Sequence, residues 1–148
     1  MKLVTQVRYG IRIMLDLAMN QGNGVVQMSE ISFRQNISLK YLEQVIRPIK
    51  KAGFVTSRRG RKGGHRLAGN PEKITLAQIV RIFEKEHEPI EPDEDHEGYP
   101  QYQDTLIRQA WNEALDAFYN KLGNVTLADL SIDTTKKLWK SSDLLIFT

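Results

Sequence analysis

The sequence predicts a mainly α-helical fold with one small β hairpin. Apolar residues recur every three or four positions in several segments, which is the periodicity of helices with one buried face. The stretch at 54–68 differs, because two short strand-like runs, 54–59 and 65–68, flank a turn that contains three glycines. A chain of 148 residues can form one domain with an attached helical element.

Two helices are predicted before the basic part of the chain. The first begins at Thr5, whose hydroxyl can cap it, and ends at the glycine-rich turn over 21–24. After a short strand-like pair of valines, a second helix is expected near 30–36. It is short and amphipathic, with Ile31 and Phe33 as its apolar residues.

The third predicted helix covers residues 39–52 and ends at Gly53. Ser38 is a suitable N-cap, because its hydroxyl can accept a hydrogen bond from a backbone N–H of the first turn. Pro48 lacks a backbone N–H, so we expect a bend or a 3₁₀ turn near the end of this helix. The residues expected to face the core are Leu42, Val45, Ile46 and Ile49.

Charge is distributed unevenly along the chain. Residues 1–70 contain 13 Lys and Arg against 3 Asp and Glu, whereas residues 71–148 contain 8 against 15. The balances of +10 and −7 add up to the net charge of +3. This asymmetry predicts a polyanion-binding domain at 1–72 and a helical region with another role at 73–148, in which 84–98 form an acidic loop.

The order of three helices and a basic hairpin is that of a winged helix-turn-helix domain, which binds double-stranded DNA. Its third helix enters the major groove, where side chains distinguish all four base pairs, and the hairpin, or wing, reaches the adjacent backbone or minor groove. The residues predicted to contact bases are Ser38, Lys40, Tyr41, Glu43 and Gln44. Those predicted on the wing are Arg58, Arg59, Arg61, Lys62 and Arg66.

Other interpretations of these residues are open. Tyr41 and Gln44 can instead be solvated or lie at the edge of the core, and the wing can be a solvated loop. Five cations around three glycines are costly without a nearby anion, which favours phosphate contact. The glycines match neither G-x-G-x-x-G nor G-x-x-x-x-G-K-[ST], so a nucleotide-binding loop is a poorer fit.

The second half begins with the capping-box pattern Thr75-Leu-Ala-Gln78, which predicts a helix over about 76–86. A long helix over about 103–122 follows the acidic loop. Its apolar stripe is too wide to leave in water, and a second copy of the chain would cover it. We therefore predict a homodimer through this helix, with a ligand cage as the less favoured alternative. The residues predicted to dimerise are Ile107, Trp111, Leu115 and Phe118.

Composition excludes several functions. Without cysteine the chain has no disulfide, no thiolate-ligated zinc, no cysteine nucleophile and no cysteine-ligated iron–sulfur cluster, so we expect no cofactor. We find no catalytic constellation and predict that the chain is not an enzyme. Neither a signal peptide nor a membrane span is evident, so a cytoplasmic protein without membrane contact is expected.

A metal site in the acidic loop is also not expected, because the spacing of its polar residues matches no recognised site. The side chains considered are His87, Glu91, Asp93, Glu94, Asp95, His96 and Glu97.

Residues 35–68, with the sequence QNISLKYLEQVIRPIKKAGFVTSRRGRKGGHRLA, closely resemble the Rrf-type winged-helix transcriptional regulators. The first helix, the helix after 75–78 and the segment 125–130 after the long helix also resemble this family, so the resemblance covers nearly the whole chain. Its most specific part is the combination of 38–44 with 63–67. The resemblance implies a homodimer whose long helices cross and which binds an imperfect palindrome, and we expect a repressor. It also implies that 38–44 meet the major groove and that Arg59 of the wing enters the minor groove.

One departure from the family concerns its cofactor. Many members hold an iron–sulfur cluster through three cysteines before the long helix, whereas 91–105 of this chain contain none. Cysteine-free members sense through a partner enzyme, so a metabolic enzyme or a small-molecule effector is a candidate partner. The alternative function is an interaction module with weak or lost DNA binding, suggested by the acidic loop and the apolar tail at 144–147. The complete basic wing argues against it.

Overall fold

The described part of the chain is residues 5–84 and 101–146 of a computed structural model, with the side chains of 5–84 and 105–136. It consists of helices and one antiparallel two-stranded sheet, which confirms the mainly α fold with a small wing. In chain order the elements are α1 (Thr5–Met19), η1 (Gln21–Asn23), α2 (Met28–Gln35), α3 (Leu39–Lys51), β1 (Val55–Arg58), β2 (Gly64–Leu67), η2 (Pro71–Lys73), α4 (Leu76–Phe83), α5 (Gln101–Gly123) and α6 (Leu127–Ile146).

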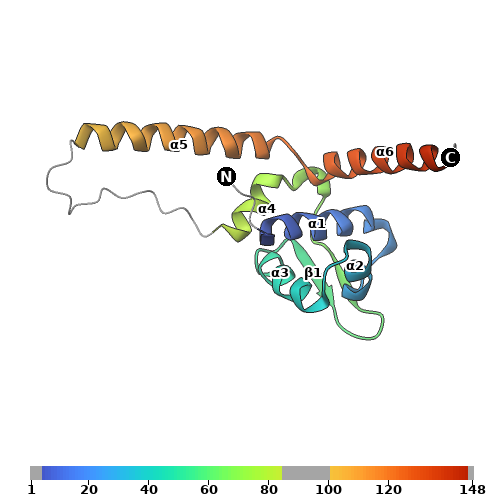
Figure 1. The fold of residues 1–148 in the computed structure, drawn as a ribbon. Coiled ribbons are helices and arrows are strands. Elements are labelled where there is room, and N and C mark those ends of the chain that lie inside the picture. Colours follow the sequence, from blue (N-terminus) through green and yellow to red (C-terminus); the bar gives the residue numbers. More distant parts are fainter. Residues whose placement is uncertain (1–4, 85–100, 147–148) are drawn as a thin grey trace.

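Helix α1 is the central element of the globular part, because it contacts α2, α3, α4, α6 and β2 (Figure 1). It can do so because its apolar face is broad, since the partly buried Tyr9, Ile11 and Ala18 also pack against the core. Its buried apolar residues are Val7, Ile13, Met14 and Leu17. The charged residue Asp16 is also buried on this helix.

Helix α2 begins earlier than predicted, because Gln27 and Glu30 form a capping box at its N-terminus. Asn36 ends it in a left-handed conformation, with φ of 52°. Ile31 is fully buried, as an amphipathic helix requires, but Phe33 is 89% exposed. The prediction that both residues belong to one apolar face was wrong, since residues two apart lie about 200° apart around a helix.

Helix α3 begins at the predicted cap: the backbone N–H of Tyr41 donates to Ser38 Oγ at 3.3 Å. The helix continues past Pro48 to Lys51, and a 3₁₀-type hydrogen bond from Gly53 N to Lys50 O, at 3.0 Å, closes its end. Proline removes one donor, but its own carbonyl still accepts from Ala52 N at 2.9 Å. The four residues predicted to face the core, Leu42, Val45, Ile46 and Ile49, are buried.

The wing is joined to the rest of the fold by a backbone bridge between β2 and the single residue Val26. Strands β1 and β2 pair from Val55 opposite Leu67 to Arg58 opposite Gly64. On the other edge of β2, Val26 N donates to His65 O at 2.8 Å and His65 N donates to Val26 O at 2.7 Å. The short strand predicted around Val26 is therefore a single bridge, and it holds the hairpin beside the turn that precedes α2.

The chain returns to the core after the long helix. The predicted capping box at Thr75 is present, with Thr75 N donating to Gln78 Oε1 at 2.9 Å. Leu127 N donates to Ile74 O at 2.9 Å, and both of these residues are buried in the same core as α1 and α3. The core thus extends across the boundary predicted at residue 72. Residues 85–98 of the predicted acidic loop lie outside the described part of the chain.

Helices α5 and α6 extend beyond the globular part (Figure 1). Helix α6 contacts α1 near its start, whereas α5 contacts α4. At this contact the guanidinium of Arg81 lies over the ring of Tyr119, 4.5 Å from its centroid, and the Tyr119 hydroxyl donates to a Glu84 carboxylate oxygen. Most of α5 is therefore left without a partner inside the described chain.

A buried ion pair joins α1 to α2. Arg34 donates to both carboxylate oxygens of Asp16, from Nη2 at 2.8 Å and from Nε at 3.0 Å, and Gln35 Nε2 donates to Asp16 Oδ2 at 2.9 Å. The Asp16 side chain is 3% exposed and that of Arg34 37%. The hydrogen bond to Asp16 raises the pKa of Arg34, despite the opposing effect of burial. Arg12 completes the network by donating to the Gln35 side-chain oxygen at 3.2 Å.

We expect Asp16→Asn to lower the free energy of unfolding by about 2 kcal/mol, because it leaves a partly buried guanidinium facing a neutral amide. Urea denaturation measures the change. Asp133→Asn, on the exposed surface of α6, is the matched control and should stay within about 0.5 kcal/mol of the original protein. Equal stability of the two variants would show that the ion pair does not hold α2 in place.

Candidate nucleic-acid interface

The N-terminal half of α3 presents the predicted base-contacting residues at the surface. Ser38, Lys40, Glu43 and Gln44 are exposed, but Tyr41 is half-buried. The Tyr41 ring packs edge-on against Tyr9 of α1, with 5.2 Å between ring centroids. This contact limits the positions that the Tyr41 ring can take, whereas its exposed neighbours can adjust to a ligand.

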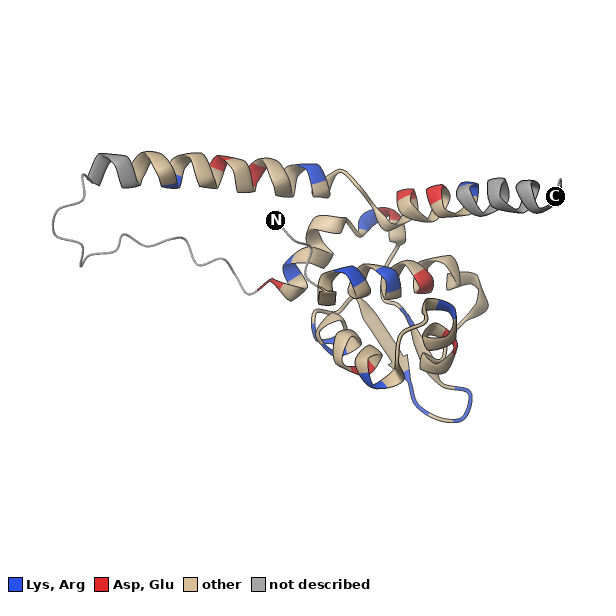
Figure 2. Cartoon of the chain, in the orientation of Figure 1, with Lys and Arg blue, Asp and Glu red and all other residues tan. Residues whose placement is uncertain are grey.

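Lys and Arg residues are concentrated along the wing (Figure 2). The five predicted cations are all exposed: Arg58, Arg59, Arg61, Lys62 and Arg66. Within residues 5–84 and 105–136, the one ion pair is that of Arg34 with Asp16, so no described carboxylate neutralises the wing. A surface of this kind attracts phosphates, and the structure places it beside α3.

Glycines determine the shape of the wing turn. Gly60 has a φ of 109°, which side chains rarely allow, and Gly63 N donates to Gly60 O at 2.9 Å. A Cβ on Gly63 would lie 2.2 Å from the carbonyl oxygen of Arg58. Gln27 Nε2 donates to the carbonyl of Arg61 at 3.4 Å, which ties the turn loosely to the start of α2.

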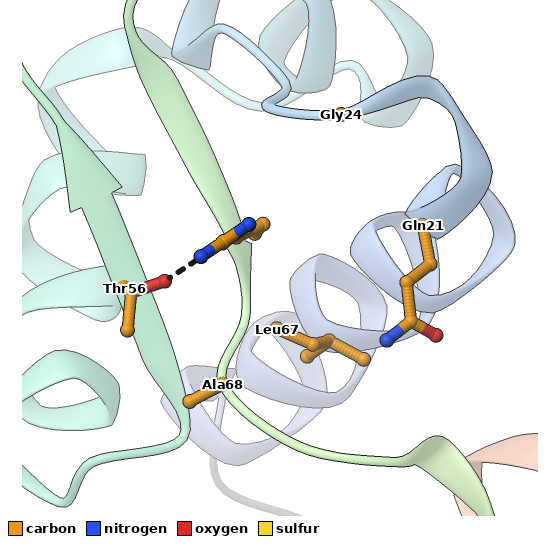
Figure 3. A pocket seen from close by; sticks show the side chains of 6 residues that line it. Gln21, Gly24, Thr56, Leu67 and Ala68 are labelled. Atoms are coloured by element: carbon orange, nitrogen blue, oxygen red, sulfur yellow. Dashed lines mark hydrogen bonds between the residues drawn. The ribbon is translucent and has the colours of Figure 1, made fainter.

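The two faces of the hairpin differ. On its outer face Arg66 Nε donates to Thr56 Oγ1 at 3.4 Å, beside an open hollow of about 360 Å³ (Figure 3). The hollow is lined by Gln21, Gly24, Thr56, Arg66, Leu67 and Ala68. Arg66 is the one charged side chain among these lining residues, and it already donates to Thr56.

The inner face of the hairpin encloses a second groove against α3. This inner groove, of about 290 Å³, is lined by Met28, Glu43, Ile46, Arg47, Lys50 and His65. The half-buried His65 has its Nδ1 2.9 Å from Ser57 Oγ, and burial together with the charge of Lys50 lowers its pKa. Arg47, Lys50 and His65 are missing from the residues predicted from sequence. The three-to-four-residue spacing of 43, 47 and 50 was the available signal for one face of α3.

The predicted dimerisation residues occupy one face of α5. Ile107 is 65% and Trp111 51% exposed, whereas Leu115 and Phe118 are half-buried near the contact with α4. Large apolar side chains in a row on a surface mark a site of interaction.

The exposed helix beside a cationic wing defines the class of the protein: it is a winged helix-turn-helix DNA-binding transcriptional regulator. Residues 3–133 match the Rrf2 family, described as "Iron-dependent Transcriptional regulator", and the chain belongs to this family. It is 43% identical over 135 residues to Protein rrf2 of Nitratidesulfovibrio vulgaris, covering 91% of this chain and 90% of the relative. It is 37% identical to the transcriptional regulator CymR of Bacillus subtilis, covering 88% and 90%.

Solved structures agree with this assignment. The structure of CymR, the global cysteine regulator of B. subtilis, has a TM-score of 0.72 with 37% identity, covering 88% of this chain and 96% of that one. IscR of T. potens has a TM-score of 0.71 with 32% identity, covering 90% and 88%. These proteins are regulators, which confirms the prediction that the chain is not an enzyme.

The family description mentions iron, and the donor set of this chain can be tested against it. There is no cysteine anywhere in the sequence, so the chain lacks the thiolates that hold iron–sulfur clusters. Among the residues that the structure describes, no three His, Cys, Asp or Glu side chains form a metal-binding group. The residues therefore do not fit a cysteine-ligated cluster. The histidines and carboxylates of 87–97 lie outside the described residues.

No helix in the described residues is both long and apolar enough to span a membrane.

We expect Gly64→Ala to lower the free energy of unfolding by about 2 kcal/mol and to weaken DNA binding. A Cβ there would lie 2.5 Å from the carbonyl oxygen of Val26 and would force the wing away from its bridge. Gly69→Ala is the control, because nothing lies within 4 Å of its Cβ. Thermal denaturation and DNA titration measure both effects, and a stable Gly64→Ala variant would contradict the close contact.

Proposed function

We propose that the chain is a homodimeric, sequence-specific transcriptional repressor that works in the cytoplasm and binds one palindromic operator. The observation that supports this most directly is the exposed N-terminal half of α3 beside a wing with five exposed, unneutralised cations. A helix and a cationic loop on one side of a rigid body suit a major groove and the backbone next to it.

In this proposal the two elements have different tasks. Ser38, Lys40 and Gln44 of α3 offer donors and acceptors to base edges, and Glu43 can accept a hydrogen bond from cytosine N4. Arg59 lies in the exposed wing turn and would enter the minor groove, whose negative potential attracts arginine. The remaining wing cations would contact phosphates and fix the register.

The dimer follows from α5. Its exposed apolar face would be covered by the same face of a second copy, as in an interface with twofold symmetry. Two copies of α3 related in this way would meet two half-sites about 34 Å apart, which is one turn of DNA, and the operator would then be a palindrome. A dimer that occupies a promoter in this way blocks transcription by occlusion alone.

The proposed regulator works without a cysteine-ligated cluster, because the chain supplies no thiolate. Its signal would therefore come from a partner protein, such as a metabolic enzyme, or from a small-molecule effector.

Selection of genomic fragments with the purified full chain tests the whole proposal. One enriched palindromic sequence, bound far more tightly than bulk DNA, is the expected result. Absence of any preferred fragment, together with recovery of a partner protein, would favour the interaction module instead.

Arg59→Ala should weaken binding to the selected operator about tenfold or more and lower the steepness of log affinity against log salt by about 0.9. Fluorescence anisotropy at several salt concentrations measures both quantities. Lys73→Ala, an exposed cation in η2 away from the wing, is the control and should change neither. Equal losses of operator affinity in Arg59→Ala and Lys73→Ala would mean that binding depends only on the net charge of the protein.

Trp111→Glu should convert the dimer to a monomer, because it places a charge in the apolar face of α5. Sedimentation velocity measures the oligomeric state, and operator affinity should fall with it. Asn120→Glu adds the same charge to the opposite, exposed face of the helix and should leave the dimer intact. A dimeric Trp111→Glu protein would exclude this face as the interface.

A further inference from the structure

The inner groove between α3 and the wing is lined in part by Arg47, Lys50 and His65, which are not among the residues predicted from sequence to bind DNA. Its floor is apolar, formed by Met28 and Ile46, and its rim is formed by Glu43, Arg47, Lys50 and His65. It lies between the two elements that the proposed function places in adjacent grooves of DNA. A DNA backbone runs between a major and a minor groove, so it would pass over this opening.

The register of the hairpin directs His65 toward this groove. Val55 and Leu67 form the buried pair on the inner face, and Ser57 opposite His65 is the next pair on that face, two residues along each strand. The backbone of His65 makes two hydrogen bonds to Val26, and its Nδ1 lies beside Ser57 Oγ. The imidazole is therefore held in place before any ligand arrives.

The charges around the groove favour an anion. Helix α3 contributes Arg47 and Lys50 as cations and Glu43 as a carboxylate. Met28 from α2 and Ser57 from β1 are uncharged. Within the described residues neither cation forms an ion pair with a carboxylate. Glu43 precedes Arg47 by one helical turn and Lys50 by about two, so the end of the groove near Lys50 and His65 is the more positive.

We propose that the inner groove is a seat for one backbone phosphate of DNA, held by Arg47, Lys50 and the protonated form of His65. The proposal rests on the proposed DNA-binding function and adds these three residues to it. It also makes binding a proton-linked event, because the third partner of the phosphate gains its charge when the phosphate arrives.

The sign of this linkage follows from the surroundings of His65. In the free protein, burial and the charge of Lys50 hold the pKa of His65 below its usual value near 6.5, so the ring is neutral at neutral pH. A phosphate in the groove favours the charged form and raises that pKa. The complex then binds more protons than the free protein, so affinity rises as the pH falls, by at most about tenfold per pH unit for one group.

The test compares the full chain with three variants on the selected operator between pH 6 and 8. The original protein should bind more tightly at pH 6 than at pH 8, and His65→Gln should abolish this pH dependence of the affinity. Lys50→Gln should lower the steepness of the salt dependence by about 0.9. Lys51→Gln is the matched control, because Lys51 is an exposed cation one residue further along α3 that does not line the groove.

A direct titration keeps the proposal testable even where a variant folds poorly. The imidazole resonances of the original protein, assigned by their loss in His65→Gln, should show a higher pKa for His65 with operator bound than without it. An unchanged pKa on binding, or a pH dependence of affinity that persists in His65→Gln, would overturn the phosphate seat. The proposed function would survive this result, whereas it would fail if the original protein selected no operator at any pH.

Discussion

The placement of the DNA-binding elements depends on one buried carboxylate. Asp16 lies inside α1, where an uncompensated charge would be very costly, and two hydrogen bonds from Arg34 and one from Gln35 satisfy it. Because both partners belong to α2, they hold α2 in one orientation on α1. Helix α3 follows directly, and the wing attaches through Val26 just before α2. The orientation of the binding surface therefore depends on this ion pair together with the apolar contacts that α1 makes with α3 and β2.

Unlike Asp16 and Arg34, the cations of the DNA-binding surface are not paired with carboxylates in the described residues. Where Asp16 and Arg34 satisfy each other, the cations of the wing and of the second half of α3 are left exposed without carboxylate partners in the described residues. Their mutual repulsion is tolerated because water surrounds them and salt screens them. An arriving polyanion removes this repulsion, and the inner groove provides a place where a phosphate meets several donors at once.

The periodicity of the sequence was sufficient for the helices, the hairpin and the cap at Ser38, because these depend on neighbouring residues. It was insufficient for Asp16, which interrupts an apolar stripe in the sequence. Asp16 can be buried because it accepts hydrogen bonds from Arg34, and a local pattern cannot show a partner 18 residues away. It was also insufficient for Phe33, which a local pattern assigned to the core although α2 turns it to solvent. The exposed residues of α3 and the wing were identified from charge and position. The inner groove was missed because His65 meets Lys50 only after the hairpin pairs and docks on Val26.

The bridge between Val26 and His65 has a mechanical consequence. The bridge fixes the hairpin to the turn that leads into α2, and α3 follows α2 directly. It therefore limits how far the wing and α3 can move apart. A fixed spacing between the wing and α3 fits duplexes whose groove widths match it. DNA sequences that reach these groove widths at low deformation energy would be preferred, even at base pairs that no side chain touches. The sequence selectivity of such a protein depends partly on the stiffness of the DNA, in addition to the base edges that α3 contacts.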